Sequence, residues 1–173
     1  MFRHLFRVTH MSLKLGVVMD PIESINYKKD TTLALLWAAQ DRGWSLFYIE
    51  PDGLSLEGEV PMARSRPLRV HRDPSRWFEL EDPDTAPVSD LDIVLMRKDP
   101  PFDMEYIYST YLLERAEREG TLIVNRCQSL RDCNEKLFAT EFGDCCPSLI
   151  VSRNIPKLRE FHSQHKDVIF KPL

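Results

Sequence analysis

The stretch LDIVLMRKDPPFD, residues 91–103, joins one of the most hydrophobic runs of the chain to a rigid and charged segment. Residues 91–97 form the continuous apolar run that is typical of a parallel strand buried on both faces. Pro100 and Pro101 fix their own φ angles and hold the residues before them extended. The stretch therefore predicts a buried strand whose carboxyl end presents Arg97 with little conformational entropy left to lose on binding.

Apolar runs of strand length alternate with segments of helical period along the rest of the chain. Such alternation implies right-handed crossovers, and it predicts an α/β fold with a mainly parallel sheet and helices on both faces. Residues 52–89 depart from this pattern and are predicted to form a hairpin-like excursion followed by a loop. The other predicted strands are 13–20, 44–51, 121–125, 147–153 and 167–173, and the predicted helices are 31–43, 104–120, one that starts at Ser129 and one that opens at Pro156.

The first two helices carry local signals at their ends. Asp30 or Thr31 is expected to cap the first helix, and Gly43 is expected to end it. The second helix is expected to stop near Gly120. The apolar face of this second helix consists of Met104, Ile107, Tyr108, Tyr111 and Leu112.

The third helix is predicted from Ser129 and Asp132, which match the S-x-x-D form of the capping box. Lys136 would then lie on this helix, with its stem against an apolar stripe and its ammonium reaching a cleft. The residues expected to be buried along the stripe are Leu130, Cys133, Leu137 and Phe138.

Length and composition bound the possible functions. A chain of 173 residues suffices for one domain, or for one domain and a piece of another. A net charge of −4 provides no basic field for nucleic acid, and no apolar run approaches the ~20 residues of a membrane span. Four cysteines without a C-x-x-C pair are typical of reduced thiols in a cytoplasmic protein. Residues 1–11 are expected to be a disordered extension.

Charged residues follow the predicted strands at their carboxyl ends, where open α/β sheets bind their ligands. Asp20 ends the first strand, Arg97 a later one and Lys171 the last. We expect these three side chains to surround one anion-receiving crevice, with Lys136 reaching in from a helix, because an arginine there suits a carboxylate or a phosphate. From position alone, the alternative is a structural pair of Arg97 with Asp20 or Asp99 that terminates the sheet.

Several familiar catalytic patterns are missing from the sequence. It has neither a G-x-G-x-x-G fingerprint nor a Walker A loop, so it lacks a phosphate cradle of its own. It also has no G-x-S-x-G elbow, and nothing places a serine, a histidine and an acid as a triad. We therefore assign no catalytic nucleophile.

Five strings of residues carry a family resemblance: VVMDP (17–21), MRKDPPFD (96–103), LERAEREGTLIVN (113–125), SLRDCNEKLF (129–138) and FKPL (170–173). Together they closely resemble the bacterial glutathione synthetases, which belong to the ATP-grasp ligases. The match runs from about Leu13 to the last residue and is weakest between residues 52 and 89. It implies that residues 12–132 form a Rossmann-like pre-ATP-grasp domain and that residues 133–173 are the truncated start of an ATP-grasp domain, with its first helix and strands.

The resemblance implies an enzyme that uses ATP and magnesium to ligate γ-glutamylcysteine and glycine through an acyl phosphate, giving glutathione, ADP and phosphate. The partners would be small-molecule substrates, with no nucleic acid and no membrane, and the full-length form is expected to be a cytoplasmic homo-oligomer. Carried over by position, Lys136 and Lys171 resemble the two lysines that contact ATP. The residues assigned to the γ-glutamylcysteine site are Arg97, with Asp20, Ser24 and Asn26 bordering the same cleft; no catalytic residue and no metal ligand is assigned.

The chain departs from the family pattern at its end, because it stops at Leu173 before the family's glycine-rich loop, acidic magnesium ligands and substrate-gripping arginines. We therefore expect a truncated product or a fragment that has no ligase activity alone. Two alternatives remain open. One is a receiver-like phosphoacceptor domain, in which Asp20, Asp99 and Lys171 form the phosphoacceptor set. The other is a non-catalytic remnant that binds a partner subunit or a substrate without chemistry.

Overall fold

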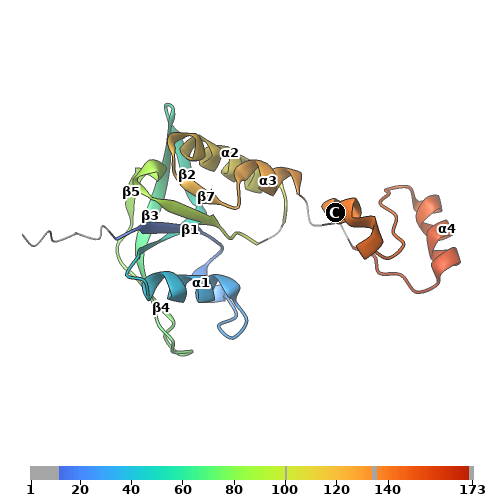
Figure 1. Cartoon of the computed structure of the whole chain (residues 1–173), viewed down its shortest axis with the longest axis horizontal. Helices are drawn as coiled ribbons and strands as arrows, with labels where there is room; N and C mark the ends of the chain where they lie inside the picture. The colour runs from blue at the N-terminus through green and yellow to red at the C-terminus, as the bar shows by residue number, and fades with distance from the viewer. Residues whose placement is uncertain (1–11, 100, 134–135, 172–173) are drawn as a thin grey trace, which may run out of the picture. The chain divides into compact units, whose positions relative to one another are not determined.

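The computed structural model describes residues 12–99, 101–133 and 136–171 (Figure 1). The chain divides into two units, Met1–Gln128 and Ser129–Leu173. The expected disordered extension, residues 1–11, lies outside the described residues, and the predicted domain division after residue 132 stays a prediction. No helix in the described part of the chain is both long enough and apolar enough to cross a membrane.

The first unit is built on one mixed sheet, which has seven strands among the described residues. Its order is β4-β3-β2-β1-β6-β7, and β5 pairs with β3. The pairs β1–β2, β1–β6 and β6–β7 are parallel, whereas β2–β3, β3–β4 and β3–β5 are antiparallel. The strands are β1 (Lys14–Val18), β2 (Ser45–Glu57), β3 (Val60–Val70), β4 (Phe78–Leu80), β5 (Asp84–Pro87), β6 (Ile93–Met96) and β7 (Leu122–Val124).

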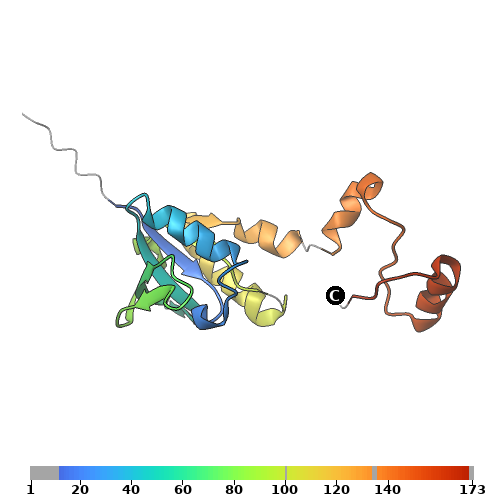
Figure 2. The ribbon, with the colours of Figure 1, turned by 90° about the horizontal axis from the view of Figure 1, so that it is seen from below.

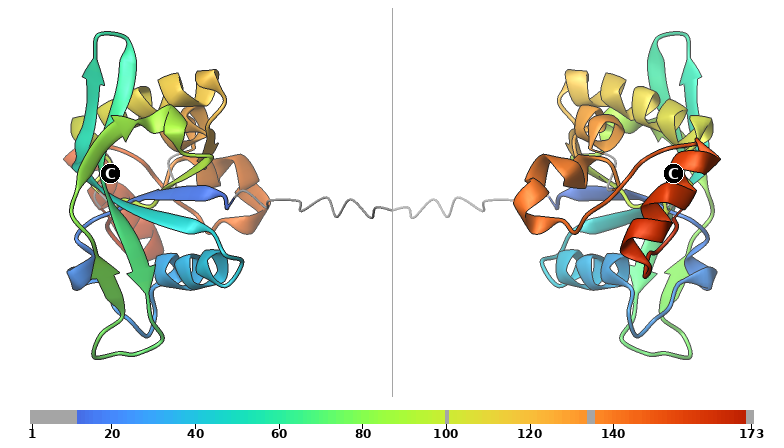
Figure 3. Two further views of the ribbon diagram at one scale, coloured as in Figure 1. Left: turned by 90° about the vertical axis from the view of Figure 1, so that its left-hand side faces the viewer. Right: turned by 90° about the vertical axis from the view of Figure 1, so that its right-hand side faces the viewer.

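The α/β class is confirmed, but only half of the sheet is parallel, and the reason lies in residues 52–89. The strand predicted at 44–51 continues to Glu57, and a tight turn with Gly58 at φ +62° reverses the chain directly into β3. A hairpin of this kind is necessarily antiparallel. The predicted excursion is therefore confirmed, while the predicted loop contains β4 and β5. Figure 3 shows the hairpin tip beside the helix α2 (Met104–Glu119), where Nη1 of Arg115 donates to the carbonyl of Glu59 at 3.3 Å.

Two helices cover opposite faces of the sheet, as predicted (Figure 1). The helix α1 (Thr31–Gln40) lies over β1 (Figure 2) and buries its apolar side against Leu15, Val17 and other residues of one face. Asp30 caps this helix, because its side chain accepts from the backbone N–H of Leu33 at 2.7 Å. The helix ends at Gln40 rather than at Gly43.

The face of α2 that packs on the sheet is not the apolar face expected from the sequence. The buried residues of α2 are Ser109, Thr110, Leu113 and Ala116. Met104, Tyr108 and Tyr111 of the expected face are instead 48–61% exposed. Small residues let a helix backbone approach a sheet closely, and tyrosines keep their hydroxyls in water, so packing distance and hydration override hydrophobic periodicity here. The helix stops at Gly120, as expected.

Around and within the second unit, several local predictions are wrong. The helix α3 (Cys127–Asp132) begins before Ser129 and ends before Leu137, so Leu137 and Phe138 do not share its face and are exposed. The next element is a 3-10 helix, η3 (Phe138–Cys145), and it is followed by α4 (Ile155–His165), which Asn154 caps by accepting from the N–H of Lys157. Pro156 lies in the first turn of α4, as predicted.

Residues 147–153 and 167–171 do not form the predicted strands. A strand needs a neighbour that satisfies its backbone N–H and C=O groups, and no strand is present among the described residues of this unit to provide one. Ile169 and Phe170 are consequently 85% and 65% exposed. The remaining predicted strand residues, 172 and 173, lie outside the described part.

We predict that Gly16→Ala destabilises the first unit by about 1–3 kcal/mol, because overpacking a filled core forces side chains off their preferred rotamers. A Cβ at position 16 would lie 2.7 Å from Cδ1 of Leu91 and 3.3 Å from Cδ1 of Ile49. Urea denaturation of the single variants and the double variant with Leu91→Ala measures the effect. The cost of Gly16→Ala should be smaller in the Leu91→Ala background; an equal cost in both backgrounds would contradict the steric explanation.

Candidate functional site

The candidate site lies where β1 and β6 end side by side. These parallel strands pair Val18 with Met96, and the N–H of Arg97 continues the ladder by donating to the carbonyl of Val18 at 2.7 Å. The same register places Asp20 beside Lys98, just beyond the ends of both strands. The carboxyl edge of the sheet therefore gathers charged residues from two segments that are far apart in the sequence, as predicted.

Side-chain alternation separates these charges onto two faces of the sheet. Ile93 and Leu95 pack on the face that carries α1, so Arg97 points to that face as well. Lys98 follows the opposite parity, and its ammonium lies 3.3 Å from Oδ1 of Asp20. An ion pair between Arg97 and Asp20, one of the structural alternatives, is therefore not formed.

Asp20 ties the segment after β6 to the end of β1. Its Oδ1 accepts from the Lys98 ammonium, and its Oδ2 accepts from the backbone N–H of Asp99 at 3.0 Å. The Lys98 side chain is only 14% exposed, so this carboxylate compensates a mostly buried cation. Asp20 thereby uses both oxygens to hold residues 98 and 99 in place.

Arg97 reaches the N-terminus of α1 and contacts two neighbouring threonines there. Its Nε donates to Oγ1 of Thr32 at 3.0 Å, and its Nη2 donates to Oγ1 of Thr31 at 2.8 Å. Thr32 is buried, while Arg97 itself remains exposed. The other structural alternative, a pair of Arg97 with Asp99, is not formed either. Neither threonine was predicted as a site residue from the sequence. Side-chain alternation along β6, which directs Arg97 to the face of the sheet that α1 covers, is the signal that could have indicated them.

The loop 21–26 borders the same edge and is anchored to the core. Its buried Ile22, in the 3-10 helix η1 (Ile22–Ser24), donates its N–H to Oη of Tyr48 at 3.3 Å, and its carbonyl accepts from Nε1 of Trp77 at 3.3 Å. Burial, and then the hydrogen bond to Glu50, raises the pKa of the Tyr48 hydroxyl above its ordinary range. This phenol therefore stays protonated and keeps its donor role.

Ser24 and Asn26, which were assigned to the substrate site, make local hydrogen bonds. The hydroxyl of Ser24 donates to the carbonyl of Pro21 at 2.6 Å. The side-chain oxygen of Asn26 accepts from the N–H of Lys28 at 3.1 Å, which is an Asx-turn. These bonds shape the loop, and the assignment of both residues to substrate binding stays a prediction.

Lys136 and Lys171 belong to the second unit. Lys136 lies in the turn between α3 and η3 and is half-buried, so its predicted place on a helix is wrong. Lys171 is exposed and follows α4 in an irregular segment. The expected crevice shared by these lysines and Arg97 stays a prediction.

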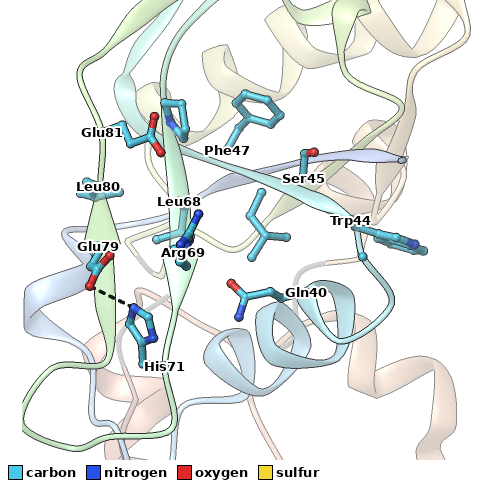
Figure 4. Close-up of a pocket in the computed structure, with 13 residues that line it drawn as sticks. Gln40, Trp44, Ser45, Phe47, Leu68, Arg69, His71, Glu79, Leu80 and Glu81 are labelled. Atoms are coloured by element: carbon cyan, nitrogen blue, oxygen red, sulfur yellow. Dashed lines mark ion pairs between the residues drawn. The ribbon is translucent and has the colours of Figure 1, made fainter. Parts of the chain in front are cut away.

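A separate hollow of about 880 Å³ opens at the other end of the sheet, where β2 begins (Figure 4). Trp44, Phe47 and Leu80 are among its lining residues. Nε2 of His71 lies 3.3 Å from Oε1 of Glu79 on its rim (Figure 4). None of the residues assigned from the sequence lines this hollow. Within the described residues, no group of three acidic, histidine or cysteine side chains could hold a metal ion.

Comparison with known proteins finds two family models that match successive parts of the chain. The N-terminal domain of prokaryotic glutathione synthetase matches residues 13–131, and the ATP-grasp domain of prokaryotic glutathione synthetase matches residues 135–173.

Curated proteins named glutathione synthetase match as well. The sequence is 61% identical over 163 residues to the protein of Pseudomonas aeruginosa, covering 94% of this chain and 51% of that protein. It is 60% identical over 163 residues to the protein of Pseudomonas putida, with the same two coverages. It is 55% identical over 161 residues to the protein of Shewanella oneidensis, covering 93% of this chain and 51% of that protein. The chain spans about half the length of the curated relatives it matches.

We predict that Asp20→Ala lowers the free energy of unfolding by about 1–3 kcal/mol, because it leaves the Lys98 ammonium mostly buried without its carboxylate. Lys98→Met in the same chain should restore part of this loss, since it removes the uncompensated charge. Chemical denaturation followed by tryptophan fluorescence measures both effects. Asp52→Ala, at an exposed position on β2, is the matched control, and a loss of similar size there would refute the role given to Asp20.

Proposed function

Because the chain belongs to the prokaryotic glutathione synthetase family, we propose that it forms the N-terminal half of an ATP-dependent ligase that joins γ-glutamylcysteine to glycine. The observation that carries this proposal is the order of the two matches, with an N-terminal domain over 13–131 followed at once by an ATP-grasp domain over 135–173. This order supports the division into a pre-ATP-grasp domain at 12–132 and the start of an ATP-grasp domain at 133–173.

In this proposal the carboxyl edge of β1 and β6 receives the dipeptide. Arg97 binds a carboxylate of γ-glutamylcysteine, and the pair of Asp20 with Lys98 holds the segment that carries it. Ser24 and Asn26 contribute the loop that borders the substrate. The guanidinium of Arg97 is fixed at a strand end and has N–H groups without an acceptor among the described residues, and this supports the role.

Lys136 and Lys171 bind the phosphates of ATP in the proposed enzyme, since ammonium groups suit phosphate oxygens by charge. Bound ATP with magnesium supplies the phosphoryl group that activates the dipeptide carboxylate, and the amine of glycine then displaces phosphate. The contribution of this chain is positioning and charge neutralisation rather than covalent catalysis. We propose that the magnesium ligands lie in the part of the enzyme that this chain does not span, since the chain covers 51% of the Pseudomonas aeruginosa relative.

Residues 147–153 and 167–171 support the view that the ATP-grasp domain continues. Both segments have the apolar composition of strands, and both lack a neighbouring strand among the described residues. We propose that they pair with further strands of the same domain in a longer protein. That protein would be cytoplasmic and homo-oligomeric.

The two alternatives are weaker. A receiver-like domain would use the set of Asp20, Asp99 and Lys171, but both carboxylate oxygens of Asp20 are engaged by residues 98 and 99. The antiparallel half of the sheet also differs from the parallel sheet of such a domain. A non-catalytic remnant that binds a partner or a substrate would also retain the fold and Arg97, and formation of glutathione by the joined protein distinguishes it from the proposed ligase.

We expect the 173-residue chain alone to produce no ADP from ATP, γ-glutamylcysteine and glycine. The same residues, followed by the second half of the Pseudomonas aeruginosa relative, should release ADP and glutathione only when both substrates are present. Coupled ADP release and mass detection of glutathione measure this. Failure of the joined, folded protein to form glutathione would refute the proposed function.

Within that complete enzyme, we expect Arg97→Ala to raise the KM for γ-glutamylcysteine about tenfold or more while leaving the KM for ATP within about twofold, because a charge-assisted hydrogen bond to the dipeptide is lost. Lys136→Ala should show the opposite split. Steady-state kinetics with each substrate varied in turn provides the measurement. If Lys136→Ala and Arg97→Ala changed the same KM, the assignment of two separate substrate sites would be wrong.

A further inference from the structure

The threonine pair at the start of α1 holds one edge of the Arg97 guanidinium. Nε donates to Thr32 at 3.0 Å and Nη2 donates to Thr31 at 2.8 Å. By the covalent geometry of arginine, Nε–H and one N–H of Nη2 lie along the same edge of the planar group. Both hydroxyl oxygens therefore accept from the edge that could otherwise grip a carboxylate side-on.

Three N–H groups of the guanidinium remain, and two of them, one on Nη1 and one on Nη2, lie along its end-on edge. The two N–H groups of Nη1 and the second one of Nη2 make no hydrogen bond to residues in the described ranges 12–99, 101–133 and 136–171. This edge has the spacing for two parallel N–H···O bonds to a carboxylate. An acceptor that approaches Arg97 is thus restricted to an end-on, bidentate geometry.

The threonines are suited to fix this orientation. Thr32 is 4% exposed, and its β-branched side chain has few rotamers available in a helix. The helix that carries both residues starts at a defined point, because Asp30 caps it. Side-chain alternation along β6 directs Arg97 to the face of the sheet that carries α1. The backbone of Arg97 is held by its hydrogen bond to Val18, and the threonine hydroxyls are held by the helix.

The N-terminal end of a helix carries partial positive charge, which disfavours a guanidinium beside it. The Asp30 carboxylate, which caps α1, offsets part of this charge, and the two threonine hydroxyls are neutral. A carboxylate bound to Arg97 would offset the positive charge that remains in this region.

We propose that Thr31 and Thr32 are positioning residues of the γ-glutamylcysteine site, which orient Arg97 so that its Nη1/Nη2 edge binds a substrate carboxylate end-on. The proposal rests on the proposed function, because it takes Arg97 as the residue that contacts the dipeptide. It adds two residues and a binding geometry that the family resemblance did not assign. Neither threonine contacts the substrate in this proposal; both act through Arg97.

The test uses the complete enzyme, with residues 1–173 followed by the second half of the Pseudomonas aeruginosa relative. Thr32→Val removes the hydroxyl oxygen at nearly constant volume, whereas Thr32→Ser keeps the oxygen and removes a methyl group. Thr121→Val is the matched control, because Thr121 is also buried in the first unit and lies beyond α2, away from Arg97. Each variant is measured for its Tm and for the KM of each substrate.

We expect Thr32→Val to raise the KM for γ-glutamylcysteine about tenfold, which is the loss of one oriented hydrogen bond at the arginine. The KM for ATP should stay within about twofold, as should every constant of Thr32→Ser and Thr121→Val. In the Arg97→Ala background, Thr32→Val should have no further effect on the dipeptide KM. A double Thr31→Val, Thr32→Val variant should lose more than either single one.

The outcomes separate this proposal from the one it rests on. If Arg97→Ala raises the dipeptide KM and Thr32→Val does not, the positioning role is refuted while Arg97 keeps its place in the site. An equal rise in every KM for Thr32→Val, or an equal loss in Thr32→Ser, would also refute it, since general damage to α1 would explain both. If Arg97→Ala leaves the dipeptide KM unchanged, the proposed substrate site fails together with the positioning role.

Discussion

The parallel pairing of β1 with β6 is the constraint on which the candidate site depends. It aligns Val18 with Met96, and the hydrogen bond from Arg97 to Val18 carries the alignment past the strand ends. In this register, the alternation of side chains between the two faces of the sheet places Lys98 beside Asp20 and directs Arg97 toward the helix α1. A shift by one residue would exchange the two faces, place Arg97 beside the wrong partner and bury Lys98 against apolar side chains.

Asp20 and Arg97, two charged groups at this edge, differ in how completely their hydrogen-bonding atoms are paired with other described residues. Each carboxylate oxygen of Asp20 accepts a hydrogen bond from the protein itself, one from Lys98 and one from Asp99. Among the residues that the structure describes, the guanidinium of Arg97 has acceptors along one edge only. The sheet edge therefore combines two features. The ion pair of Asp20 with Lys98 holds the segment after β6, and Arg97 has N–H donors without an acceptor among the described residues. Lys98 thus contributes to stability, whereas its neighbour Arg97 is the residue that we propose for binding.

The second unit shows how far strand propensity depends on a partner. Residues 147–153 and 167–171 have strand-like composition, but the described residues around them provide no strand to pair with. In the first unit the opposite occurs. Residues 52–89 have a weak strand pattern, but they join the sheet because β3 pairs with both β4 and β5. Pairing is a property of two segments, and inspection of one segment at a time misjudges it in both directions.

The sequence by itself determined the α/β class, a cap at Asp30 or Thr31, the stop at Gly120 and the strand that ends at Arg97, because each depends on residues close together in the chain. Its odd strings, MRKDPPFD and SLRDCNEKLF, also determined the family, which the matches to both family models bear out. Only the tertiary structure decided that Tyr108 and Tyr111 lie outside, that Lys98 rather than Arg97 pairs with Asp20, and that Thr31 and Thr32 hold Arg97. Those outcomes depend on register and packing distance between segments, which no local pattern encodes.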